Sequence, residues 1–456
     1  IPFTYEKNKV LTYNDIHTDL KWSTDKIGQE RAKKYIESIL LMLRNKVLLN
    51  NGDLSKTEIV WFYPASMTTS RLKHFNNAWA EKFEALFAAP KNQVGTIPES
   101  IAPYYYYKSN KGADSTVVSI DIGGGTTDVL IADRGEAKYL TSFRFAANTI
   151  FGDGYSYNAE SNGFVKKYID EIVGKLQTNE LKDLGDVLKS VYNKRVSTDI
   201  IAFLFSLNSN QEIKKKKVDI NFGEMLANDN KGKYVVIMFY VAIMYHIAKL
   251  MKAKNFNMPR HMTFSGNGSK VLSILCLDNE DNKTLETLTK LIFEEIYGKP
   301  YSVDGLEIIR PKDSKESTCK GAFQIQDIDK LSADDSIENF KKMKTILLGI
   351  DGETFAQAQM KYSDISEADL DSVLNEVKEY IEFAFNLDKK FSFHEYFDVD
   401  CSIMSPIKEL CYRDIRTYLE NGLAAKKSDL TGANDDLEET LFFYPIVGII
   451  NAIVRN

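Results

Sequence analysis

Residues 117–128 combine a strand-like run with three glycines and a set of oxygen-bearing side chains. The run Val117 to Ile122 contains Asp121, and the segment Gly123-Gly124-Gly125-Thr126-Thr127-Asp128 follows it directly. Glycines let a phosphate group approach backbone N–H donors closely, and they permit the dihedral angles that such a loop requires. The two threonines add hydroxyl donors. The segment therefore predicts a phosphate-binding loop.

Two carboxylates flank this loop. Asp121 and Asp128 predict a magnesium site, because Mg²⁺ prefers oxygen ligands and commonly accompanies a triphosphate. A strand resumes after the loop, so the loop is a hairpin and not the helix-entry loop of a P-loop or Rossmann protein. The alternative interpretation is a glycine-rich turn without a ligand.

The elements around the loop predict an α/β fold with a mixed sheet, because strands alternate with helices and two of them form a hairpin. We expect helices at residues 29–50, 68–86, 165–205 and 283–297, and strands at 58–63, 116–121, 129–132, 262–264 and 306–309. The run Tyr104 to Tyr107 indicates a helix that packs on the sheet rather than a base-stacking surface.

The segment Ile120 to Asp128 resembles the second phosphate motif of the superfamily of actin, DnaK-type heat-shock chaperones and sugar kinases. Five further segments resemble motifs of that superfamily in the same order along the chain: Val60–Ala65, Ile97–Ala102, Ala147–Gly152, Phe264–Ser269 and Lys320–Ala322. In this order, the first four are similar to the strand that ends in Pro-Ala, the connecting segment, the turn after the phosphate hairpin, and the adenosine motif. The last is similar to the Gly-Ala at the start of the helix that closes that domain. The resemblance implies an actin-like, ribonuclease-H-like fold over about residues 30–330.

The resemblance also implies roles for individual residues. Phosphates of ATP or ADP would contact the loop, Asp121 would act on magnesium and its waters, and Glu99 would lie near the attacking water. The remaining residues implied are Gly123, Gly124, Gly125, Thr126 and Thr127 for phosphates, Asp128 for magnesium, and Gly266, Asn267, Gly268 and Ser269 for adenine and ribose.

Besides Asn267, which stands where the adenosine motif usually has glycine, two features depart from the superfamily pattern. Nothing in residues 1–58 matches the first phosphate hairpin, so either the chain is truncated at its N-terminus or half of the phosphate clamp has been lost. Proline precedes Glu99 instead of following it. Both features predict slow hydrolysis or none.

The chain divides into three predicted regions. Residues 1–115 would form a partial first lobe, and residues 116–334 a second lobe with a small outer subdomain at about 165–232. Residues 335–456 would form a mostly helical C-terminal appendage, because glycine becomes sparse there and helical periodicity dominates.

Composition narrows the class of protein. The formal net charge of −6 over 456 residues argues against a general nucleic-acid binder. The most apolar run, Tyr234 to Met251, contains His246 and Lys249 and predicts a buried core helix rather than a membrane span. Four cysteines without metal spacing and five scattered histidines predict a cytoplasmic protein with free thiols and no transition-metal site.

These features together predict an ATP-binding switch protein, whose helical C-terminal region meets a protein partner or a second copy. The alternatives are an actin-like filament subunit and a degenerate scaffold that does not hydrolyse nucleotide. A peptide-binding chaperone domain and the catalytic aspartate of a sugar kinase are not recognisable in the sequence.

Overall fold

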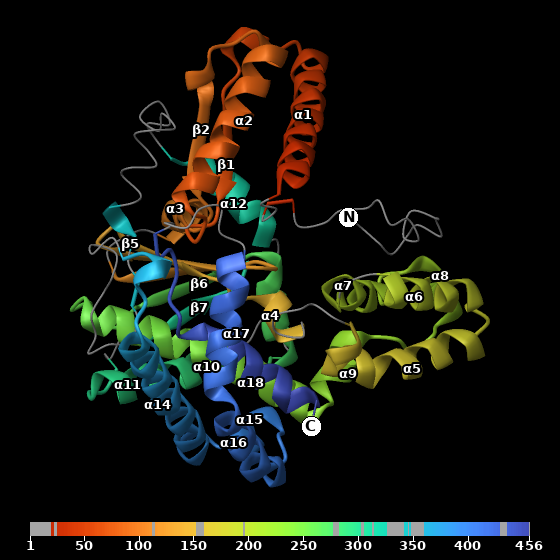
Figure 1. Ribbon diagram of the computed structural model, residues 1–456, viewed down its shortest axis with the longest axis vertical. Coiled ribbons are helices and arrows are strands. Elements are labelled where there is room, and N and C mark those ends of the chain that lie inside the picture. The colour runs from red at the N-terminus through yellow and green to blue at the C-terminus, as the bar shows by residue number, and fades with distance from the viewer. Residues whose placement is uncertain are drawn as a thin grey trace.

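The structure is a computed structural model (Figure 1). It describes residues 20–21, 25–111, 115–151, 159–194, 197–276, 282–301, 305–311, 314–325, 342–344, 346–347, 360–428 and 436–455. Parts of the predicted N-terminal lobe and C-terminal region, and Gly152 of the turn motif, lie outside these residues.

The first part of the chain is a small α/β unit. Strands β1 (Ile59–Tyr63) and β2 (Val94–Pro98) pair in parallel, and α1 (Lys26–Leu49) packs on α2 (Thr69–Phe87). The Thr68 hydroxyl caps α2 by accepting a hydrogen bond from Arg71 N. In Figure 1 these elements stand together at the top of the molecule.

The second sheet has five strands in the order β5-β4-β3-β6-β7. Its strands are β3 (Val117–Ile122), β4 (Thr127–Asp133), β5 (Glu136–Phe143), β6 (His261–Ser265) and β7 (Glu307–Ile309). Neighbouring strands are antiparallel from β3 to β5 and parallel from β3 to β7. A meander of three strands followed by parallel strands is the mixed sheet expected of an actin-like lobe, and the predicted fold class is confirmed.

Helices cover both faces of this sheet. Val118, Ile120 and Ile122 of β3 point into the core that contains α10 (Asn230–Ala253). The alternate residue Val117 lies with Tyr104 and other residues of α3 (Ile101–Lys111) on the opposite face. Strand side chains alternate between faces, so the face with α3 is also the face of Asp121.

Helix α12 (Ser314–Ala322) crosses α3 at very close range. A Cβ atom built on Gly321 would lie 1.7 Å from the carbonyl oxygen of Ala102, so only glycine fits at this crossing. The expectation that Lys320-Gly321-Ala322 opens a helix is wrong, because these residues end α12.

The long insertion between β5 and β6 is helical. It contains α4 (Ala147–Phe151), α5 (Gly163–Thr178), α6 (Lys182–Lys194), α7 (Ser197–Leu207), α8 (Gln211–Lys216), α9 (Phe222–Ala227) and α10. Figure 1 shows α5 to α9 projecting to one side of the sheet as a separate group. Helix α10 is long and apolar enough to cross a membrane, but 94% of its apolar window is buried inside the chain. The predicted core helix is confirmed.

The C-terminal helices share one hydrophobic core with the second sheet. They are α14 (Glu367–Phe391), α15 (Phe393–Phe397), α16 (Met404–Arg413), α17 (Ile415–Ser428) and α18 (Phe443–Arg455), and α11 (Lys283–Tyr297) lies beside α14. Helix α18 contacts the sheet directly, while the others pack on α10, α11, α18 and one another. The ring of Phe443 stacks on Phe143 at 4.1 Å and on Phe145 at 4.6 Å. Helix α18 therefore belongs to the same hydrophobic core as β5.

Candidate functional site

Four polar side chains form a row across four adjacent strands on the face of α3. Ser142, Asp128, Asp121 and Ser265 are direct neighbours in the strand registers of β5, β4, β3 and β6. All four are buried, and the Ser265 hydroxyl donates to Asp121 Oδ2 at 3.1 Å. A buried row of polar side chains is costly unless its groups are paired or serve a ligand.

Asp128 joins this row to the first part of the chain. Its Oδ1 accepts a hydrogen bond from Ala65 N at 2.8 Å, in the Pro-Ala turn that follows β1. Burial, with further contributions from the charges of Glu99 and Asp121, raises the pKa of Asp128 to about 7, against the opposing effects of Ala65 N–H and Lys21. The group therefore titrates near neutral pH.

Glu99 follows β2 and approaches the same row from the other sheet. Its backbone N donates to Tyr63 O at 2.8 Å, and its side chain is partly exposed. Lys21 Nζ lies 2.6 Å from Glu99 Oε1. The structure thus brings together the three carboxylates that the sequence singled out, Asp121, Asp128 and Glu99, and it adds a lysine that sequence reasoning missed.

The glycine loop closes the hairpin between β3 and β4. Gly123 N donates to Thr126 O at 2.9 Å, while Gly124 and Gly125 are exposed. None of the three glycines has a positive φ, so left-handed backbone is not the reason for glycine here. A Cβ on Gly123 would lie 3.2 Å from Thr126 O, which is a tight contact, whereas a Cβ on Gly124 would lie 3.4 Å from the side-chain amide of Asn148, which is an ordinary van der Waals distance.

The start of α4 holds this loop from behind. Asn148 N donates to Gly124 O at 2.8 Å and Ala147 N donates to Gly123 O at 3.3 Å. The Thr127 hydroxyl donates to Phe145 O at 2.6 Å and so holds the end of the loop to the segment after β5; the phosphate role expected of Thr127 stays a prediction. Because the loop carbonyls are engaged on the side of α4, the amides of Gly124 and Gly125 are left for the exposed side.

The segment predicted to border adenine packs directly on the hairpin. Gly266 has φ of +78°, and a Cβ there would lie 2.2 Å from Ile122 O. A Cβ on Gly268 would lie 2.1 Å from Gly123 O. The Ser269 hydroxyl donates to Gly266 O at 2.7 Å and is buried, whereas Asn267 is exposed. Both glycines are thus required by contact with the β3 end, and Asn267 is the member of the segment that presents a side chain to solvent.

A buried charge cluster lies beside the site, and sequence reasoning missed it. Glu439 is fully buried, with Lys426 Nζ at 2.8 Å from its Oε1. Its Oε2 accepts from Arg144 N at 2.7 Å, one residue beyond the end of β5. Burial acts to raise the pKa of Glu439, but Lys426 and Arg144 outweigh it and the pKa lies below its ordinary value.

The neighbouring Glu438 reaches the first part of the chain. It accepts from the Thr69 hydroxyl at the start of α2 at 3.5 Å, and it pairs with Lys344. Burial, Glu438 and Asp128 together raise the pKa of Tyr63. Residues 438 and 439 therefore lie between the two parts of the candidate site and the C-terminal helices.

The donor set fits a magnesium ion held mostly through water. Within the described residues, no group of three or more His, Cys, Asp or Glu side chains is placed to hold a metal. Asp121 and Asp128 are register neighbours and offer only oxygen. Mg²⁺ usually takes one or two carboxylates, with waters and substrate phosphates as its other ligands.

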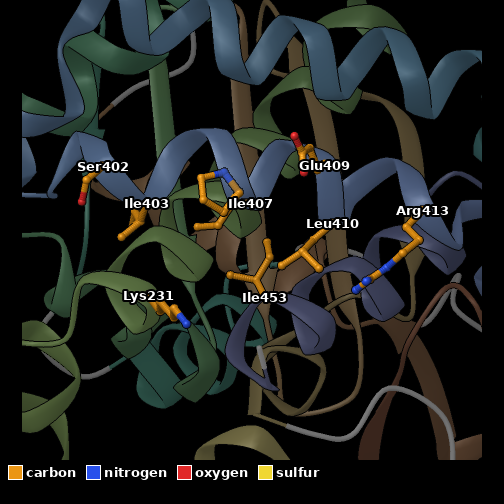
Figure 2. Close-up of a pocket in the computed structure, with 9 residues that line it drawn as sticks. Lys231, Ser402, Ile403, Ile407, Glu409, Leu410, Arg413 and Ile453 are labelled. Carbon is orange, nitrogen blue, oxygen red and sulfur yellow. The ribbon is translucent and has the colours of Figure 1, made fainter.

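A pocket of about 510 Å³ lies away from this site. It is lined by Lys231 of α10, by Ile453 of α18, and by Ser402, Ile403, Pro406, Ile407, Glu409, Leu410 and Arg413 in and beside α16. Figure 2 shows Lys231 and Arg413 at opposite sides of it, with Leu410 and Ile453 between them. It belongs to the C-terminal helices and shares no residue with the polar row.

Among known proteins, only solved structures are similar to this chain. No protein-family model matches the chain, and no curated protein matches it. Similar solved structures include the ethanolamine utilization protein EutJ from Carboxydothermus hydrogenoformans, with 12% identity, a TM-score of 0.29, and coverage of 67% of this chain and 82% of that one. MreB5 of Spiroplasma citri bound to ADP has 16% identity and a TM-score of 0.30, with 68% and 78% covered.

The Ppx/GppA phosphatase of Aquifex aeolicus is similar at 11% identity and a TM-score of 0.29, with 66% and 83% covered. Scores this low carry no argument of their own. The fold assignment of this chain rests on the strand order of its five-stranded sheet and on the β3–β4 hairpin.

Proposed function

We propose that this chain binds ATP or ADP with magnesium beside the β3–β4 hairpin and acts as a nucleotide-dependent switch with slow hydrolysis. The observation that carries the proposal is the buried row Ser142, Asp128, Asp121 and Ser265 next to the end of the β3–β4 hairpin, where Gly124 and Gly125 are exposed. Backbone amides suit phosphate oxygens, and adjacent carboxylates suit the magnesium that accompanies them. The bound ion would neutralise phosphate charge.

Each predicted residue has a part in this proposal. Gly123 to Thr126 would hold the phosphates, and Asp121, oriented by Ser265, would bind waters of the ion. Gly266 to Ser269 would border the nucleoside, with Asn267 as the exposed side chain. Thr127 would support the loop through its bond to Phe145.

Slow hydrolysis is supported by the state of Glu99. A residue that positions or deprotonates water needs a free carboxylate oxygen within hydrogen-bond reach of that water. Lys21 Nζ engages Glu99 Oε1 at 2.6 Å, which both neutralises and orients the group.

The contacts of Glu438 and Glu439 support the proposal that the protein acts as a switch. Glu438 contacts Thr69 in the first part of the chain, and Glu439 contacts Arg144 in the second sheet and Lys426 in α17. A change in the distance between Thr69 and Arg144 would therefore act on the C-terminal helices. We propose that these helices meet a protein partner, for which the pocket between α10, α16 and α18 offers a binding site, and that the protein is cytoplasmic.

Calorimetric titration of magnesium-ATP tests nucleotide binding. Asp121→Asn is expected to weaken binding at least about tenfold, since it removes the carboxylate next to the ion. Glu136→Gln, an exposed carboxylate at the start of β5, is the matched control and should change nothing. The absence of binding by the unmodified chain would overturn the proposal.

Sedimentation separates the switch from a filament subunit. A switch is expected to remain a small species with magnesium-ATP, with magnesium-ADP and without nucleotide. Pelleting that requires ATP would instead identify a filament-forming protein.

A further inference from the structure

Helix α1 carries an exposed apolar face. Seven of the nine large hydrophobic side chains that are exposed in the described part of the chain lie on it. They are Ile27, Tyr35, Leu41, Met42, Leu43, Leu48 and Leu49. Apolar side chains concentrated on one element mark a contact surface, whereas single exposed ones are ordinary.

Contacts with α2 fix which side of α1 faces outward. Gly28, Ala32, Ile36 and Leu40 are buried at four-residue spacing against the neighbouring helix. Lys82 of α2 pairs with Glu37 at 2.9 Å, and Arg44 Nε donates to Leu86 O at 3.0 Å. In Figure 1 α1 lies beside α2, and no helix or strand lies along its other side.

The spacing on the outer face suits a second helix. Tyr35, Met42 and Leu49 follow one another at seven-residue intervals, and Leu41 and Leu48 form a neighbouring row. A seven-residue repeat keeps side chains on one side of a helix, so that they can pack along the whole length of a partner helix. The polar residues between the rows, Ser38 and Asn45, are small.

The charge on this face selects the partner. Arg31 and Lys34 are exposed on the same side as Tyr35, and neither forms an ion pair with a described residue. Lys26 and Lys46 are exposed near the two ends of the helix. If a second copy of α1 packed on this face, the basic residues of the two helices would repel each other. A partner helix with acidic residues would instead be attracted.

We propose that the outer face of α1 binds an amphipathic α-helix of another protein, with an apolar stripe flanked by acidic residues. The partner helix covers the rows of Tyr35, Met42 and Leu49 and of Leu41 and Leu48. Its acidic flank pairs with Arg31 and Lys34. This surface is separate from the nucleotide site and does not depend on it.

The probe is a fluorescent synthetic peptide of about four heptads with Leu at positions a and d and Glu at e and g. A second peptide has Lys in place of Glu. Like charges keep both peptides from pairing with themselves. The full chain is expected to bind the acidic peptide at least about tenfold more tightly than the basic one, because attraction replaces repulsion.

Substitutions on the chain test the site. Met42→Ser with Leu49→Ser is expected to abolish binding, and Arg31→Glu with Lys34→Glu is expected to reverse the preference between the peptides. Phe323→Ser, at an exposed large hydrophobic outside α1, is the matched control and should change nothing. All these side chains are exposed, so thermal unfolding should be unchanged.

Three outcomes would overturn the proposal. Equal binding of both peptides, or binding of neither, would exclude the acidic helix. Self-association that Met42→Ser with Leu49→Ser removes would identify a second copy as the occupant. Altered hydrogen exchange in residues 1–19 of that variant would identify the chain's own N-terminal residues instead.

Discussion

Gly268 lies against the carbonyl oxygen of Gly123 so closely that a Cβ atom on Gly268 would come within 2.1 Å of that oxygen. The segment after β6 is thus packed on the hairpin that we propose to hold phosphate. Two glycine motifs that are far apart in sequence are one structural unit. Any change at Gly268 must therefore move the phosphate loop.

Gly268→Ala is expected to destabilise the protein by about 1–3 kcal/mol or more, because the methyl group meets backbone that is held on its other side by α4. Magnesium-ATP binding should weaken in parallel. Urea unfolding and calorimetry measure the two effects.

Gly174→Ala is the matched control for this substitution. Gly174 lies inside α5, and a Cβ there would meet nothing within 4 Å. The control is expected to leave nucleotide binding unchanged and to stabilise the helix by up to about 1 kcal/mol. Equal stability of the two variants would contradict the close packing of Gly268.

The sequence predicted the elements whose pattern is local. Strand β3 is rich in β-branched residues, since four of its six residues are Val or Ile, and α2 begins at a threonine pair that can cap a helix, so both were found within one or two residues. Strand β5 was missed because its first half is exposed and carries Glu136 and Lys138. Strand β2 was interpreted as a connection because it contains glycine and proline, and its pairing with β1 is a tertiary property.

In the candidate site too, the residues in a local sequence pattern were found, and those brought together by tertiary contacts were not. The Asp121 hairpin can be predicted from twelve consecutive residues. The burial of Glu439 cannot, because its partners lie in other parts of the chain and no local sequence pattern connects them to it. Arg144 is 295 positions away from Glu439 in the chain. The predicted roles of the site residues, including Glu99 and Asp128, stay predictions that require a bound nucleotide to test.

Asp128→Asn is expected to change how stability depends on pH. The pKa of Asp128 is raised from 3.8 to about 7 in the folded protein, mainly by burial, so its ionised form disfavours folding. The stability from the protonated group is fully present below about pH 4 and is lost as pH rises through about 7.

The asparagine variant keeps an acceptor for Ala65 N but does not ionise. Between pH 4 and 8 the free energy of unfolding of the variant should therefore rise relative to that of the unmodified chain by on the order of 4 kcal/mol, at about 1.4 kcal/mol per pKa unit. Urea unfolding at several pH values measures this difference. A difference that is constant with pH would mean that Asp128 does not titrate in this range.

Two neighbours of Asp128 should shift that pH dependence in opposite directions. Glu99→Gln removes a negative charge and should lower the pKa of Asp128, while Lys21→Met removes a positive charge and should raise it. The pH dependence of the stability of each variant is compared with that of the same variant carrying Asp128→Asn in addition. The difference isolates the contribution of the Asp128 carboxyl group. Shifts of the same sign would show that structural relaxation, and not charge, dominates.

Glu439→Gln is expected to destabilise the protein by about 3–5 kcal/mol, because it leaves Lys426 buried without a carboxylate. Lys426 Nζ lies 2.8 Å from Glu439 Oε1, and both side chains are almost completely inaccessible to solvent. Adding Lys426→Met to Glu439→Gln should recover part of the loss, since the uncompensated charge is removed. Glu420→Gln breaks the exposed pair with Arg416 and serves as the control, with little measurable change expected.

The same variant tests the coupling between the nucleotide site and the C-terminal helices. Glu439 holds the backbone of Arg144 next to the hairpin, so magnesium-ATP should protect α17 and α18 from hydrogen exchange in the unmodified chain and less so in the double variant. The double variant is used because its stability is closer to that of the unmodified chain. If nucleotide protected α17 and α18 equally in both proteins, Glu439 would be a stabilising residue only, and the movement of a switch would have to pass through Glu438 and Thr69.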